Sequence, residues 1–247
     1  MNADMWLEVI VAEGDRLIDT DPAQLAAPVP TCPGWTVHDV IGHTGAVHRW
    51  AADKVCQTGL YRGYDTIAFP DDATVIDWYC DGRDLLVREL RQRDPDAPAK
   101  TFVGERTNAW WCRRQANEVA VHRFDLDSAT RAGDERPIEA GVAAAAIDEW
   151  LELFAPRFVE MGPGVPEHLL GRTLHLHAHD HTDGEWVLTV TPRGFDVTRG
   201  HVKADAALRG SASDLLLALW HRRALKELDV AGEGSVADEI LDLVHVT

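Results

Sequence analysis

A carboxylate and an imidazole, Glu118 and His122, stand four residues apart in the run RRQANEVAVHRFDLDSAT. No Gly or Pro occurs from Glu105 to Ala132, so a helix is predicted, and its i and i+4 residues share one face. A carboxylate on a packed face is costly unless it is paired or bound to a cation. Because Glu oxygen and His nitrogen both bind metals well, the pair indicates a metal site or a half-exposed ion pair. Spacing alone favours the ion pair.

A third metal ligand would have to come from another helix. The predicted helix from Val37 to about Gln57 offers His38, His43 and His48. At ~100° per residue, His48 falls within the apolar stripe and His43 on its flank, so periodicity mildly prefers His48. A flank position can still face the interior between two helices of a bundle, where metal sites are built. Partial burial with a satisfied hydrogen bond is the simpler alternative for either histidine.

The chain also carries four histidines at alternate positions: His175, His177, His179 and His181. On a β-strand, alternate residues point to one face, so Leu174, Leu176 and Ala178 would point to the other, toward a core. This pattern favours a polar, solvated face of an antiparallel sheet. Metal binding there is less favoured, because no matching ligand cluster lies nearby in the sequence.

Two arginines, Arg222 and Arg223, end an apolar segment that predicts a helix. Cations at that place can interact with the carboxyl end of the helix. They can also hold the carboxylate of a substrate. The sequence contains no Gly-rich phosphate loop, no G-x-S-x-G elbow and no H-E-x-x-H motif.

Composition narrows the class of protein. The 247 residues carry a formal net charge of −17 and no basic block, which disfavours nucleic acid and anionic membranes as partners. No apolar stretch approaches the ~20 residues needed to span a bilayer, and the N-terminal residues do not resemble a signal peptide. The cysteines are widely spaced without a CxxC motif and predict free thiols in a reducing cytoplasm: Cys32, Cys56, Cys80 and Cys112.

The pattern of elements changes along the chain and predicts an α+β protein in two parts. Helices are expected over residues 2–20, 37–57, 73–93, 105–132 and 138–154. Gly162-Pro163-Gly164, within residues 156–166, predicts a linker. From Leu174 the period becomes two, which predicts short strands followed by helices at 211–223 and 235–244. The expected domains are a helical one over residues 1–157 and a small α+β one over 168–247.

Two motifs together resemble a known family. TCPGWTVHDVIGHTGAVHRWAA is similar to the opening signature of the maleylpyruvate isomerase N-terminal domain, a branch of the DinB/YfiT-like metal-binding four-helix bundles. NEVAVHRFD resembles that family's E-x-x-x-H-R-x-D motif. GSASDLLLALWHRR is similar to a phrase of the family's small α+β C-terminal domain, with His221 in place of the usual Gly. The resemblance covers nearly the whole chain.

The resemblance implies both a site and a chemistry. The metal ligands would be His43, Glu118 and His122, which overrules the periodicity preference for His48. The implied cofactors are a divalent metal, usually zinc, and mycothiol, whose metal-bound thiolate would attack an electrophilic small molecule bearing a carboxylate. Addition to a double bond, rotation and elimination would give cis–trans isomerisation. Arg222 would bind a substrate carboxylate, and Asp125 could orient a metal ligand, although a solvated carboxylate is an equal alternative.

Three other functions fit the same residues. A thiol S-transferase would use the same activated thiolate and would join mycothiol to an electrophile. A site of two histidines and one carboxylate can also hold Fe(II) for oxygen chemistry. A non-catalytic metal-binding protein could keep the same bundle.

Overall fold

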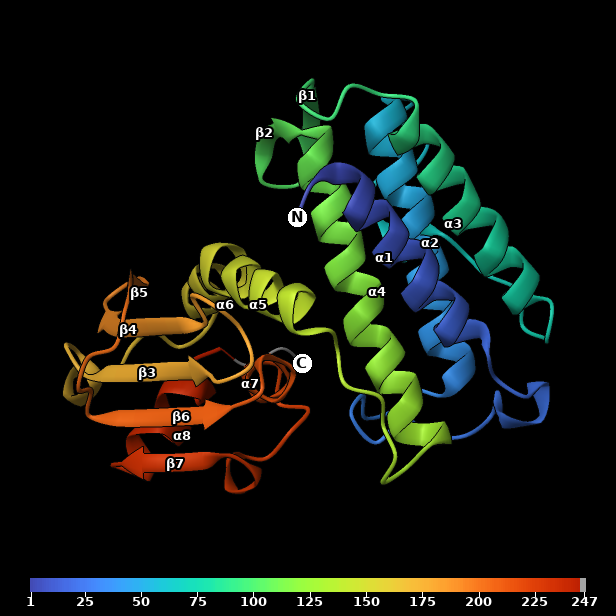
Figure 1. The fold of residues 1–247 in the computed structure, drawn as a ribbon. Helices are drawn as coiled ribbons and strands as arrows, with labels where there is room; N and C mark the ends of the chain where they lie inside the picture. The colour runs from blue at the N-terminus through green and yellow to red at the C-terminus, as the bar shows by residue number, and fades with distance from the viewer. Residues whose placement is uncertain (245–247) are drawn as a thin grey trace. The chain divides into compact units, whose positions relative to one another are not determined.

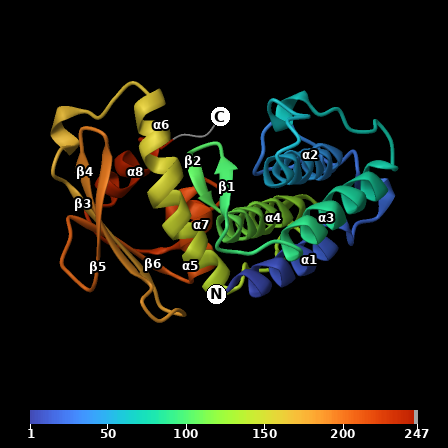
Figure 2. The ribbon, with the colours of Figure 1, turned by 90° about the horizontal axis from the view of Figure 1, so that it is seen from above.

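The computed structural model describes residues 1–244, and the chain divides into two compact units, Met1–Arg136 and Pro137–Thr247. The first unit is a bundle of four helices, seen side by side in Figures 1 and 2. Its long helices are α1 (Ala3–Ile18), α2 (Val37–Cys56), α3 (Val75–Arg91) and α4 (Asn108–Thr130). The predicted helical bundle is thereby confirmed, with each helix ending within a few residues of its expected bounds.

The start of α2 follows the capping signal in the sequence. The Thr36 side chain accepts a hydrogen bond from the backbone N–H of Asp39, and the Asp39 carboxylate accepts one from the backbone N–H of Thr36 at 2.8 Å. This reciprocal capping box satisfies two N–H groups that the first helical turn leaves without partners. The turn before it contains Gly34, whose φ of +86° suits glycine. The cap therefore fixes where α2 begins and which face of the helix each of its histidines occupies.

Apolar side chains from all four helices form the core of the bundle. Leu17 of α1, Ile41 of α2, Tyr79 of α3 and Val119 of α4 belong to one cluster and are fully buried. Glycines let α2 approach its neighbours closely, since a Cβ at Gly45 would lie 2.6 Å from the Trp78 ring. The backbone of α2 therefore lies directly against α3 at this glycine.

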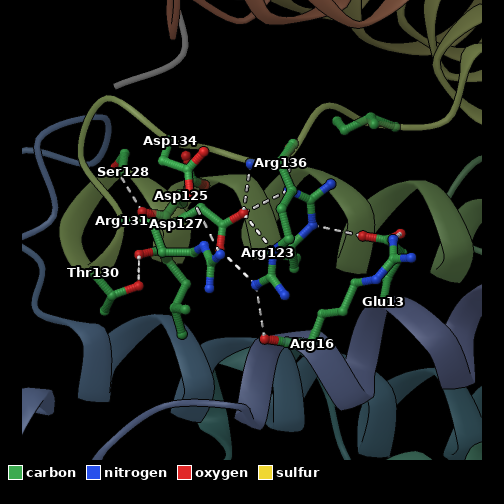
Figure 3. A network of polar contacts seen from close by, with 12 residues as sticks. Glu13, Arg16, Arg123, Asp125, Asp127, Ser128, Thr130, Arg131, Asp134 and Arg136 are labelled. Atoms are coloured by element: carbon green, nitrogen blue, oxygen red, sulfur yellow. Dashed lines mark hydrogen bonds and ion pairs between the residues drawn. The ribbon is translucent and has the colours of Figure 1, made fainter.

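A buried ionic network ties α4 to α1 and to the segment that follows α4 (Figure 3). The Arg123 guanidinium, fully buried, donates to Glu13 of α1 at 2.6 Å and to Asp127 one turn along α4 at 3.0 Å. Arg136 donates to the other oxygen of Asp127 at 2.6 Å. Burial would raise the pKa of Asp127, but the bonds from Arg136 and the charge of Arg123 outweigh it and lower the pKa. These contacts anchor α4, the helix that carries Glu118 and His122.

A hairpin precedes α4 that the sequence did not predict. Strands β1 (Pro98–Thr101) and β2 (Gly104–Thr107) pair antiparallel, so α4 begins at Asn108 and not near Glu105. Thr107 caps α4 through the backbone N–H of Trp110. The hairpin is fixed by the indole of Trp111, which donates to the carbonyl of Lys100 at 3.0 Å. This contact spans eleven residues, and local propensity gives no sign of it.

The second unit begins with a helical segment that extends into the predicted linker and ends before Gly162-Pro163-Gly164. Helix α5 (Ala140–Glu149) continues through a π-helical turn (Trp150–Phe154) into α6 (Ala155–Met161). Pro156 directly follows the π-helical turn and has no N–H to donate, which fits the break in the regular α-helical pattern at this point. Residues 137–157, which the sequence pattern placed with the N-terminal helices, therefore lie in the second unit.

A five-stranded sheet follows in the second unit, in the order β5-β4-β3-β6-β7. Its strands are β3 (Thr173–Ala178), β4 (Glu185–Thr191), β5 (Gly194–Arg199), β6 (Ala206–Gly210) and β7 (Asp229–Gly232). Only β3 and β6 run parallel. The short 3-10 turns within residues 1–244 are Pro22–Gln24, Tyr64–Thr66, Glu167–Leu169 and Leu225–Glu227.

Helices cover one face of this sheet (Figure 2). Helices α7 (Ala212–Leu219) and α8 (Gly234–Asp242) pack on β3 and β6, and α6 packs on β5. Leu174, Leu176 and Leu208 are fully buried beneath them. The small α+β C-terminal domain is thereby confirmed in outline. Among residues 1–244, no helix combines the length and the apolar character that crossing a membrane requires.

Candidate metal centre

Three side chains from two helices converge inside the bundle. His43 comes from α2, and Glu118 and His122 come from successive turns of α4. The Oε1 atom of Glu118 lies 3.3 Å from Nε2 of His43 and 3.4 Å from Nε2 of His122. One ligand atom from each residue lies within 4.8 Å of the others. The structure therefore brings together the three residues that the resemblance implies.

The spacing and chemistry of these atoms fit a zinc ion. Ligand atoms bound at about 2.0–2.1 Å in a tetrahedron lie roughly 3.3–3.4 Å apart, close to both separations from Glu118. Two imidazole nitrogens and one carboxylate oxygen form a donor set typical of catalytic zinc, with a further position open to another ligand. The donor set and both separations from Glu118 are therefore compatible with a tetrahedral metal site.

Asp125 holds the ring of His122 from behind. Its Oδ2 lies 2.9 Å from Nδ1 of His122, and its Oδ1 accepts a hydrogen bond from Thr31 at 2.7 Å. Asp125 is fully buried, so its charge acts in a medium of low dielectric constant. A hydrogen bond at Nδ1 directs Nε2 toward Glu118, as in carboxylate–histidine–metal triads. The solvated alternative for Asp125 is thereby excluded.

Burial and neighbouring charged groups shift the pKa values of all three residues. Burial lowers the pKa of His43, which favours the neutral imidazole that binds metals. Burial alone would also lower the pKa of His122, but hydrogen bonds to Asp125 and Glu118 raise it to about 9. Burial would raise the pKa of Glu118, whereas Arg114 and the two histidines hold it well below its usual range. Glu118 is therefore ionised in the site.

Aromatic rings and a cysteine line the same site. The Trp35 ring lies 4.9 Å from the His43 ring, and the Tyr64 ring meets His43 edge-on at 5.2 Å. Cys32 groups with His122 and Asp125 as a second set of potential ligands. Sequence reasoning missed the place of Tyr64 and Cys32 in the site, since Tyr64 lies in a short 3-10 turn and Cys32 in the turn before α2, both far from α4 along the chain. The Pro-Gly-Trp turn, which contains Trp35, was the only signal for any of them.

The other two histidines of α2 stand apart from this group. His48 is fully buried, and its Nδ1 bonds to Oε1 of Gln115 at 2.8 Å. Burial lowers the pKa of His48 to about 4, so it stays neutral. Nε2 of His38 lies 2.8 Å from the carbonyl oxygen of Pro70. Periodicity was wrong to prefer His48 for this group.

Arg222 lies in the second unit, just beyond α7. Its Nη1 donates to the carbonyl of Trp220 at 3.2 Å, and its guanidinium lies 5.9 Å from the centre of the Trp220 ring. His221 has φ of +56°, a left-handed conformation that glycine adopts without strain. A glycine, which the resembling family carries at this place, would therefore fit position 221 without strain. His221 makes the same turn, and its Nε2 lies 3.0 Å from the carbonyl oxygen of Val244.

Comparison with known proteins agrees with the site and the fold. The family model of the mycothiol maleylpyruvate isomerase N-terminal domain matches residues 7–127. The family model of the MDMPI C-terminal domain matches residues 141–239. The chain belongs to the mycothiol-dependent maleylpyruvate isomerase family. A search of curated protein sequences gave no significant match.

Two solved structures share the fold of this family member over most of its length. A crystal structure of mycothiol-dependent maleylpyruvate isomerase is similar with a TM-score of 0.59 and 14% identity, covering 94% of this chain and 95% of that one. A histidine-to-alanine mutant of that enzyme gives a TM-score of 0.60 and 13% identity over the same shares. At this level of identity, the likeness shows the shared fold.

Proposed function

We propose that this chain is a mycothiol-dependent enzyme that isomerises a small electrophile carrying a carboxylate, with zinc held by His43, Glu118 and His122. The observation that carries the proposal is the convergence of these three donors at the separations of a zinc site. Membership of the family supports mycothiol as the thiol. The similar solved structures bear the name of that isomerase, which supports this reaction over others of the same thiol.

Bound zinc would favour the thiolate form of mycothiol over the thiol, and so would supply the nucleophile. Residues of the chain orient and shield the three proposed ligands. Asp125 fixes the ring of His122, Arg114 forms an ion pair with Glu118, and Trp35 covers one side of the two histidines. His43, Glu118 and His122 have side chains only 10–18% exposed, so little water reaches them. A shielded site strengthens electrostatic interactions with a developing charge.

Product analysis tests the proposed reaction. The protein is incubated with mycothiol and a panel of activated cis-alkenes that includes maleylpyruvate, and both products and thiol are measured by mass spectrometry. An isomerase converts the alkene to its trans form and leaves the amount of mycothiol unchanged. A stable mycothiol adduct that accumulates with turnover would instead identify an S-transferase. Equal conversion with and without mycothiol would overturn the proposal.

Asp125→Asn is expected to weaken zinc binding by about 10–100-fold, the usual effect of losing a carboxylate that orients a metal-binding histidine. The amide keeps the shape but loses the charge that holds the Nδ1 proton of His122. The measurement is the zinc concentration that restores half of the activity to chelator-treated enzyme. An unchanged concentration would show that Asp125 plays no part in binding the metal.

Arg222→Met is expected to raise KM for a carboxylate substrate by about 10–100-fold, because a hydrogen bond to a charged group contributes about 1.5–3 kcal/mol. Arg223→Met is the matched control: Arg223 bonds to Asp214 at 2.8 Å and to Glu227 at 2.9 Å. Steady-state kinetics of both variants give the comparison. Equal KM values for Arg222→Met and the wild type would remove Arg222 from substrate binding.

A further inference from the structure

A second cluster of potential ligands lies on the sheet of the C-terminal unit. The Glu185 Oε2 atom lies 3.3 Å from Nε2 of His175 and 3.1 Å from Nδ1 of His201. The other oxygen of Glu185 lies 3.7 Å from Nε2 of His177. The three imidazole rings lie within 5.3–5.9 Å of one another. Three histidines therefore surround one carboxylate.

The register of the sheet builds this cluster. His177 of β3 lies directly opposite Glu185 of β4. His175, two residues earlier on β3, is the diagonal neighbour of Glu185. Since Leu174 and Leu176 face the helices, His175 and His177 face the opposite side of the sheet. His201 follows β5, which pairs with the other edge of β4. Two neighbouring strands and the end of a third thus supply the four side chains.

His175 supplies an independent sign of a missing ligand. Its side chain is only 5% exposed, and within residues 1–244 its Nε2 forms no hydrogen bond although it points at Glu185. A buried polar nitrogen without a partner costs about 1–3 kcal/mol. A cation between His175 and Glu185 would satisfy both.

We propose that His175, Glu185 and His201 form a second metal site, separate from the one in the bundle, which takes a zinc-like divalent transition metal. The separations of 3.1 and 3.3 Å are close to the roughly 3.3–3.4 Å between ligands of tetrahedral zinc. His177 stands beside them as a possible fourth ligand. Imidazole donors suit zinc, copper or nickel, whereas calcium and magnesium prefer oxygen.

The outer side of the cluster is open to solvent, because the side chain of His201 is 76% exposed and that of Glu185 is 25% exposed. A metal can therefore enter without opening the fold. Once bound, it would join the segment after β5 to the centre of the sheet. The site lies in a different compact unit from His43, Glu118 and His122, so it can be tested with that group disabled.

Equilibrium dialysis of the full chain against zinc tests the proposal. His43→Ala removes one donor of the bundle group, which is His43, Glu118 and His122. At about 1 μM free zinc, this variant should still bind about one zinc per chain. Adding His201→Ala should weaken that binding about 100-fold or more, since even loss of an orienting residue outside the ligand set costs 10–100-fold. His201 is exposed, so its replacement should leave the fold intact.

Adding His168→Ala instead provides the matched control. His168 is 65% exposed and pairs with Glu239 at 2.6 Å outside the cluster, so zinc binding should not change. Glu185→Gln, which keeps the side-chain shape, should repeat the loss seen with His201→Ala. No zinc bound by the His43→Ala variant, or equal binding after adding His201→Ala or Glu185→Gln, would overturn the second site. Neither result bears on mycothiol-dependent activity, which is measured separately.

Discussion

His43→Ala is expected to lower mycothiol-dependent activity by about 100-fold or more and to remove one zinc per chain. His43 is the only donor of the bundle group that comes from α2, so its loss leaves Glu118 and His122 of α4 alone. A catalytic metal contributes several kcal/mol of stabilisation, and each 1.36 kcal/mol is a factor of ten in rate. The measurements are kcat/KM with saturating mycothiol and the metal content of protein purified without chelator.

His38→Ala is the matched control for this variant. His38 lies on the same helix, and its side chain has the same 18% exposure as that of His43. Its ring contacts Phe69 and Pro70, away from Glu118. Activity and metal content should therefore stay near the wild-type values. Equal losses in both variants would mean that general damage to α2, and not loss of a ligand, explains the effect.

Asp127→Asn is expected to lower the free energy of unfolding by about 3–5 kcal/mol, the usual result of breaking a buried ion pair from one side. Asp127 is fully buried between Arg123 and Arg136. The neutral amide would take one carboxylate charge from Arg123, which is also fully buried and pairs with Glu13 in the network of Figure 3. Urea unfolding at pH 7, followed by circular dichroism, measures the loss.

Asp134→Asn is the control for Asp127. The Asp134 carboxylate is 90% exposed and lies 3.6 Å from Arg131, so its replacement should change stability by no more than about 0.5 kcal/mol. A loss below about 1 kcal/mol in Asp127→Asn would contradict the account of the buried network.

The same network gives stability a defined dependence on pH. The pKa of Asp127 is lowered in the folded chain, so the unfolded chain binds this proton more tightly. The stabilisation is complete above the unfolded value of about 3.9 and is lost as the pH falls through the lower, folded value. Wild type should therefore lose stability over that acidic range, and Asp127→Asn should lose less. Parallel curves for the two proteins would contradict the assignment to Asp127.

Local signals predicted the helix that carries the site but not the face that forms it. The absence of Gly and Pro around Glu118 predicted α4, and Thr36 with Asp39 predicted the start of α2. Periodicity placed His48 correctly in the buried stripe of α2, where its Nδ1 lies 2.8 Å from Oε1 of Gln115. A place in the apolar stripe shows burial and does not show that a side chain meets Glu118 and His122. The family motif identified His43 where the apolar stripe pointed to His48.

Contacts distant in sequence account for what could not be predicted. The β1–β2 hairpin is held by Trp111, and Pro156 was taken for a linker although it lies in the first turn of a helix. The alternating histidines were expected on a solvated face, but β3 ends at Ala178 and His175 is buried. Its neighbours Glu185 and His201 come from other strands, so spacing along one run could not reveal the cluster.

Anomalous X-ray diffraction from crystals grown with zinc tests the central claim most directly. Data collected on both sides of the zinc edge should give a peak about 2.0–2.2 Å from Nε2 of His43, Nε2 of His122 and a carboxylate oxygen of Glu118. Absence of a peak at these three residues, in crystals where the protein is active with mycothiol, would contradict the proposed metal centre. A peak at the iron edge in protein as purified would instead favour oxygen chemistry.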